Sequence, residues 1–70
     1  MKNPRADSIA HQLLNAGIGS VSASAAEAIA ARVPPKPRRV PADVLNKAVR
    51  ELIQEKVVRA VPVGEHIVLE

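Results

Sequence analysis

The stretch that decides the fold is residues 41–69, PADVLNKAVRELIQEKVVRAVPVGEHIVL. Its first half places apolar residues at the three- and four-residue spacing of an amphipathic helix. This apolar face consists of Val44, Leu45, Ala48, Val49, Leu52 and Ile53. Asp43 lies near the predicted N-terminus, where a negative charge interacts favourably with the helix dipole. The pattern predicts a helix over residues about 41–55.

The residues after this helix predict a β-hairpin. Two runs rich in valine and isoleucine, 57–61 and 66–69, have the composition of strands. Between them Pro62 fits the second position of a type I turn, and Gly64 fits the left-handed position that follows. Because an isolated two-stranded ribbon is marginal in water, we expect this hairpin, about 57–69, to pack on the helices.

A first helix is predicted upstream, over residues about 4–16. Asn3 is a good N-cap, and Pro4 suits the first helical position because no partner exists there for an N–H group. Gly17 is a typical left-handed stop. The predicted apolar face consists of Ala6, Ile9, Ala10, Leu13 and Leu14, and the opposite face of Arg5, His11 and Gln12.

The second predicted helix, about 23–33, is rich in alanine and has high helix propensity. Ser22 or Ser24 can cap it, and Ser24 has the spacing of a capping box with Glu27. The connector 18–21 is short enough to be extended and to add a third strand to the hairpin. An alanine surface allows another helix to approach closely.

A proline-rich basic segment separates the second and third helices. Pro34, Pro35 and Pro37 exclude a helix and favour extended geometry. The basic residues beside them are Lys36, Arg38 and Arg39. We expect an exposed and stiff segment that presents these three cations.

Composition narrows the function classes. Seventy residues predict one domain, 1–70, with little room for a catalytic cleft. There is no Cys, and His11 and His66 lack metal-ligand spacing. We therefore expect no catalytic residue, no metal and no cofactor. The absence of Phe, Trp and Tyr argues against readers of single strands, which stack bases on aromatic rings.

Charge and hydropathy suggest the compartment and the kind of partner. The net charge of +3 and the pI near 10.0 favour a polyanion. No apolar run approaches the roughly 20 residues of a membrane span, and no signal core follows Met1, so we expect a cytoplasmic protein. The terminal pair Leu69-Glu70 has the sequence of a cloning remnant, and Glu70 is assigned no role.

The run VLNKAVRELIQEKVV, residues 44–58, resembles the third helix and first wing strand of winged helix-turn-helix domains. Those domains show a Leu-x-x-Ala-Leu-x-x-Leu rhythm, then a few polar residues and a β-branched strand. Residues 64–69 resemble the return strand of the wing. Where this family usually has a glycine between helix and strand, the chain has Glu55-Lys56.

The resemblance implies a small winged-helix-like domain of the α+β class, with three helices followed by a C-terminal β-hairpin. It also implies that the third helix enters the major groove of duplex DNA. Its outer face carries Asn46, Lys47 and Arg50, with Gln54 further along. Arginine can pair with guanine, and asparagine or glutamine with adenine, through two hydrogen bonds each.

The remaining cations would contact the DNA backbone. Lys36, Arg38 and Arg39 are expected on phosphates, where they add affinity without sequence choice. Arg59 and His66 lie near the predicted wing and are placed to touch an adjacent backbone. An alternative for the third helix is a solvated outer face on which Lys47 pairs with Glu51 one turn later. Asp43 and Glu51 would also repel phosphate.

Two functions follow as expectations. The first is a small regulator, without enzymatic activity, that binds duplex DNA. The second is a protein-interaction regulator that docks on an acidic surface of a larger machine, such as RNA polymerase or a replication or defence complex. DNA binding requires the cations on one continuous face, whereas protein binding predicts an exposed apolar patch rimmed by them. A homodimer is a further option that the sequence leaves open, and nothing in it indicates a small-molecule substrate.

Overall fold

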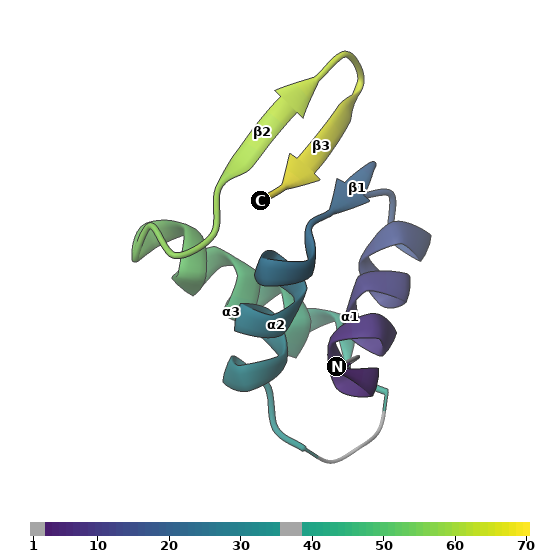
Figure 1. The fold of residues 1–70 in the computed structure, drawn as a ribbon, viewed down its shortest axis with the longest axis vertical. Coiled ribbons are helices and arrows are strands. Elements are labelled where there is room, and N and C mark those ends of the chain that lie inside the picture. Colours follow the sequence, from purple (N-terminus) through teal and green to yellow (C-terminus); the bar gives the residue numbers. More distant parts are fainter. Residues whose placement is uncertain (1–2, 36–38) are drawn as a thin grey trace.

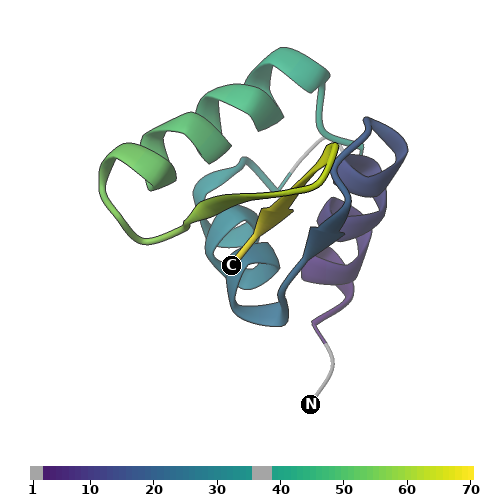
Figure 2. The same ribbon diagram turned by 90° about the horizontal axis from the view of Figure 1, so that it is seen from above.

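The computed structural model describes residues 3–35 and 39–70 as an α+β fold (Figure 1). Its elements in chain order are α1 (Pro4–Asn15), β1 (Ser20–Val21), α2 (Ala23–Arg32), α3 (Ala42–Gln54), β2 (Ala60–Val63) and β3 (His66–Leu69). Figures 1 and 2 show the three helices grouped together, with the strands over one end of the group. The predicted α+β class, with three helices and C-terminal strands, is confirmed.

The three strands form one mixed sheet in the order β1-β3-β2. β2 and β3 pair antiparallel, with Val63 opposite His66 at the connecting end. β1 pairs parallel with β3, so the connector after α1 does supply a third strand. Beyond β2 and β3, the backbones of Arg59 and Glu70 exchange two hydrogen bonds, of 3.0 and 2.9 Å. Glu70 therefore has a structural role that the sequence did not suggest.

The prediction that the first C-terminal strand starts at residue 57 was wrong, because β2 begins at Ala60. The three residues before it close the end of α3 and lead the chain back over the helices. Val58 is directed into the core and is only 1% exposed. Of the valines in the predicted strand, Val58 is thus a core residue, Val57 is exposed, and Val61 pairs with β3.

The predicted turn was also displaced. Pro62 lies within β2 opposite Ile67, and the two residues Gly64 and Glu65 join β2 to β3. Proline lacks an N–H group, and a strand tolerates it where no neighbour needs that donor. The strand order places β2 at the edge of the sheet, which satisfies this condition. Gly64 has a φ of +60° and takes the left-handed position that was predicted for it.

The helix starts are set by local caps. The side chain of Asn3 accepts a hydrogen bond of 3.2 Å from the Ala6 N–H, and Pro4 is the first residue of α1, as predicted. Ser22 caps α2 by accepting from the Ala25 N–H at 3.1 Å. The capping box predicted for Ser24 was wrong, because α2 begins at residue 23 and Ser24 lies inside its first turn.

The core is entirely aliphatic. The most deeply buried large side chains, Ile9, Ile29, Val58 and Leu69, come from α1, α2, the segment before β2, and β3. α2 packs against both α1 and α3, and Figure 2 shows it below the sheet. Its alanines keep these contacts close. In the described parts of the chain, the helices are all too short or too polar to cross a membrane.

Both ends of the proline-rich segment are anchored to α1. Arg5 donates a hydrogen bond to the carbonyl oxygen of Pro34. The side-chain amide of Gln12 donates to the Val40 carbonyl oxygen at 2.8 Å and accepts from the Val40 N–H at 3.1 Å. Val40 itself is 2% exposed. Arg5 and Gln12, which were assigned to a solvent-facing side of the helix, therefore hold the segment that leads into α3.

Candidate nucleic-acid interface

α3 presents a polar face to solvent because its other face is buried. Leu45, Ala48 and Leu52 point into the core and are at most 4% exposed. At 3.6 residues per turn, the opposite side of the helix carries the polar positions. These positions are Asp43, Asn46, Lys47, Arg50 and Gln54, and all are exposed. The structure thus brings together three of the predicted site residues on one helix face: Asn46, Lys47 and Arg50.

The two carboxylates near the end of α3 are drawn to one side by Arg32, the last residue of α2. Its guanidinium donates two hydrogen bonds to the Glu55 carboxylate, at 2.7 and 2.8 Å. A second carboxylate, that of Glu51, lies 3.7 Å from the same guanidinium. These hydrogen bonds lower the pKa of Glu55 and raise that of Arg32. Both groups are exposed, so solvent screens this pair.

This arrangement bears on the alternative in which Lys47 pairs with Glu51. In residues 3–35 and 39–70, both ion pairs of the α3 carboxylates are formed with Arg32, so Lys47 does not pair with Glu51. Arg32 therefore compensates part of the negative charge of Glu51 and Glu55 that would oppose phosphate at this end of α3. Asp43, at the other end, stays on the polar face with Lys47 and Arg50. The sequence alone did not indicate that Arg32 pairs with these carboxylates, because Glu55 follows it by 23 residues.

The other predicted site residues lie beyond the two ends of α3. Arg39 is exposed and precedes the helix by three residues. Arg59 is exposed and lies immediately before β2, after the end of the helix. Lys36 and Arg38 fall outside the described residues. Of the predicted site cations with a described position, Lys47 and Arg50 thus lie on α3, and Arg39 and Arg59 lie before and after it along the chain.

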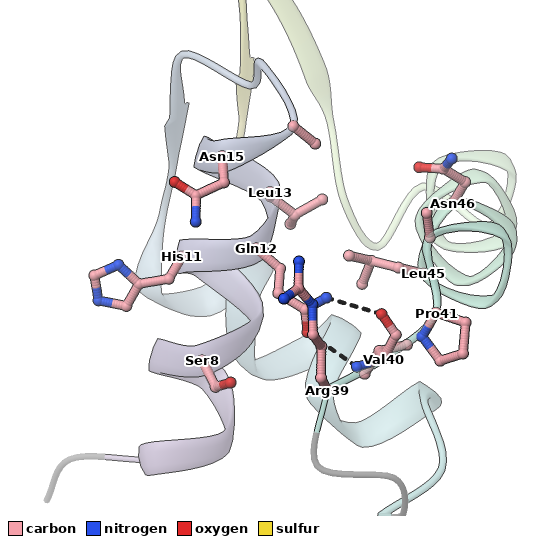
Figure 3. Close-up of a pocket in the computed structure, with 12 residues that line it drawn as sticks. Ser8, His11, Gln12, Leu13, Asn15, Arg39, Val40, Pro41, Leu45 and Asn46 are labelled. Atoms are coloured by element: carbon pink, nitrogen blue, oxygen red, sulfur yellow. Dashed lines mark hydrogen bonds between the residues drawn. The ribbon is translucent and has the colours of Figure 1, made fainter.

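A groove of about 700 Å³ separates α1 from the beginning of α3, and sequence reasoning did not foresee it (Figure 3). Leu13 of α1 and Leu45 of α3 point toward each other across it, and the Arg39 side chain stands beside them. A second hollow, which shares Leu13, Ala16 and Asn46, continues it toward Arg50. Helical periodicity gives no sign of this groove, because it depends on where the proline-rich segment places α3.

Comparisons of the chain with protein-family models, with curated proteins and with solved structures give no match. Among residues 3–35 and 39–70, no three His, Cys, Asp or Glu side chains gather closely enough to hold a metal ion. The polar face of α3 offers amide and cationic donors, which recognise anions and the edges of bases, beside the carboxylates of Asp43 and Glu51.

Proposed function

We propose that the protein is a small regulator, without enzymatic activity, that binds duplex DNA through the outward face of α3. In this proposal the arrangement is that of a winged helix-turn-helix domain. α2 and α3 form the helix pair, and the β2–β3 pair forms the wing. The order of the elements supports this, since an antiparallel strand pair follows the third helix and a short strand after α1 joins it.

The observation that carries the proposal is the group of exposed donors on α3. Asn46, Lys47 and Arg50 are exposed together on the polar face of the helix. Glu51 borders the same hollow, and it shares the guanidinium of Arg32 with Glu55. If α3 lies in the major groove, these donors face the edges of the bases. The guanidinium of arginine suits guanine, and the amide of asparagine suits adenine.

The flanking arginines would supply affinity that does not depend on base sequence. Arg39 and Arg59 lie past opposite ends of α3, as expected for side chains that contact phosphates on either side of a groove. Lys36 and Arg38 remain predicted phosphate contacts. Because each such contact releases counterions, binding should weaken steeply as salt rises.

The test is a titration of the protein with a random duplex of about 20 base pairs at several salt concentrations. The Lys47→Ala/Arg50→Ala variant is expected to weaken binding at every salt concentration. Loss of two phosphate or base contacts should also reduce the slope of log affinity against log salt by up to about two. Absence of binding at low salt, where non-specific affinity is greatest, would contradict the proposal.

A pair of variants with the same change in charge distinguishes an effect of charge on α3 from an effect of net charge on duplex binding. Asp43→Asn and Asp7→Asn each remove one negative charge, the first from the polar face of α3 and the second from the first turn of α1. We expect Asp43→Asn to strengthen duplex binding more than Asp7→Asn does. Equal effects would show that only net charge matters, and α3 would then not be the binding element.

A further inference from the structure

We propose that the groove between α1 and α3 binds an acidic amphipathic helix of a protein partner. The groove borders the outward face of α3, and the proposal does not rest on the proposed DNA binding. Three properties of the groove lead to this occupant: its walls, its apolar lining and the sign of its charge.

The walls are two helices of similar length, α1 with 12 residues and α3 with 13. A helix with its side chains is about 10 to 12 Å across, and it packs on neighbouring helices through the ridges of their side chains. α1 and α3 are held on either side of the groove by α2 and by the hydrogen bonds between Gln12 and Val40. The groove is therefore built into the fold.

Apolar side chains lie along the groove among polar ones such as Asn15 and Asn46. Leu13 and Leu45 face each other at the end near the start of α3 and are almost fully buried, whereas Pro41 and Ala42 beside them are exposed. Further along, Ile18, Val49 and Ile53 pack against the core while remaining partly exposed. Apolar surface of this kind is stabilised when the apolar face of a partner helix covers it.

The charge of the groove selects an acidic partner. Among the residues that the structure describes, no Asp or Glu lines either part of it, whereas Arg39 lies at one end and Arg50 at the other. Pro41 occupies the N-cap of α3 without a side-chain hydrogen bond, so the first N–H groups of that helix add positive potential at the Arg39 end. A basic or neutral helix would leave these cations uncompensated.

An acidic helix explains the lining better than nucleic acid does. A DNA backbone is anionic, but its phosphates gain nothing from the leucine, isoleucine and valine side chains between the two arginines. The glutamates of an amphipathic helix can meet Arg39 and Arg50 while its leucines cover the apolar lining. This combination of an apolar centre and a charged rim is typical of protein–protein contacts.

The two sites would share side chains. Asn46 and Arg50 line the groove and also the hollow on the polar face of α3. If the proposed function is correct, a helix in the groove will engage residues that DNA requires. We then expect the partner helix and duplex DNA to compete for the protein.

The test uses a fluorescein-labelled peptide of about 14 residues, a common helix length, with leucines on one helical face and glutamates on the others. Its binding is followed by fluorescence anisotropy. Arg39→Glu should weaken binding about tenfold or more, because it reverses a charge at the rim of the site. Arg59→Glu makes the same charge change outside the groove and should alter affinity much less.

Two further controls distinguish binding in the groove from non-specific electrostatic attraction between the acidic peptide and the basic protein. A peptide of the same composition with its leucines scattered should bind far more weakly, because it has no apolar face. Ala16→Trp, which places an indole at the exposed junction of the two parts of the groove, should reduce binding, and circular dichroism reports whether this variant is folded. If it is unfolded, Ala16→Leu provides the same steric test.

Several results would overturn the proposal: no peptide binding, equal loss with Arg39→Glu and Arg59→Glu, or equal affinity for the scattered peptide. The duplex titration is independent of this outcome. Peptide binding without DNA binding would support the groove and contradict the proposed function. DNA binding without peptide binding would support the proposed function and contradict the groove.

Discussion

α1 and α3 end in the same backbone motif but place different residues at its left-handed position. At the end of α1 this residue is Gly17, with a φ of +104°. The Gly17 N–H donates to the Leu14 carbonyl oxygen at 3.2 Å, and the Ile18 N–H to the Leu13 carbonyl oxygen at 3.0 Å. These two bonds satisfy carbonyl groups that a helix end leaves free, and glycine adopts the required conformation at little cost.

At the end of α3 the left-handed residue is Lys56, with a φ of +64°. The hydrogen bonds are equivalent: the Lys56 N–H donates to the Ile53 carbonyl oxygen, and the Val57 N–H to the Leu52 carbonyl oxygen, both at 3.0 Å. For a residue with a Cβ atom, this conformation costs about 1 to 2 kcal/mol. The same motif is therefore less favourable at α3 than at α1.

The difference shows how a local conformational cost is offset by contacts on both sides. Before Lys56, Glu55 is held by the guanidinium of Arg32. After it, Val58 is buried in the core and fixes the path toward β2. A local residue, Gly17, favours the end of α1, whereas contacts with distant residues stabilise the end of α3. Lys56 also adds an exposed cation at the end of the helix that we propose binds DNA.

The largest effect is expected at Gly19, directly after the α1 motif. A Cβ atom built there would lie 2.6 Å from the Cβ of His66, so the chain just before β1 approaches β3 too closely for any side chain. We expect Gly19→Ala to destabilise the protein by about 1 to 3 kcal/mol, the usual cost of forcing extra atoms into a packed site. Urea unfolding measures this. A loss below that for Gly17→Ala would show that the strands separate easily and that the close approach is unimportant.

A smaller loss is expected for Gly17→Ala. An added Cβ would meet nothing within 4 Å, so only the left-handed backbone opposes the change. The expected destabilisation is about 1 kcal/mol. Gly17→Asn is the matched control, because asparagine tolerates this conformation better than alanine and should lose less stability. An equal loss for both would mean that the backbone conformation does not limit this position.

The opposite change is expected at α3. Lys56→Gly should stabilise the protein by up to about 1 kcal/mol, because it relieves the left-handed backbone; the greater freedom of glycine in the unfolded chain limits the gain. Lys56→Ala removes the same side chain without relieving the backbone and should be close to neutral. If Lys56→Gly and Lys56→Ala give equal stability, the left-handed backbone at Lys56 does not destabilise the protein, and strain does not distinguish the two helix ends.

The local features of the fold were predictable because short-range chemistry determines them. Asn3, Pro4 and Gly17 mark the ends of α1 through caps that involve neighbours within a few residues. The exposed side of α3, with Lys47 and Arg50, follows from helical periodicity alone. A helix face needs only its own sequence to be recognised.

The long-range features were not predictable from one sequence. Arg32 and Glu55 are 23 residues apart, and Gln12 and Val40 are 28 apart, so no periodicity relates them. The displaced turn has the same origin: Pro62 is accommodated in β2 only because the sheet order leaves that strand at an edge. The groove between α1 and α3 depends on these contacts, and its chemistry became visible only with the tertiary structure.

The smallest effect is expected for the ion pair that borders Lys56, and it should depend on pH. Arg32 holds the folded-state pKa of Glu55 below its ordinary value of 4.5. A carboxyl group with a lowered pKa contributes stability above that ordinary value and loses it as the pH falls through the folded-state pKa. Urea unfolding of the wild type and Glu55→Gln should therefore differ slightly at neutral pH and converge in acid. Arg32 stays charged throughout this range, so Arg32→Gln should show the same convergence; a difference that grows in acid would mean that Glu55 is better stabilised in its protonated form.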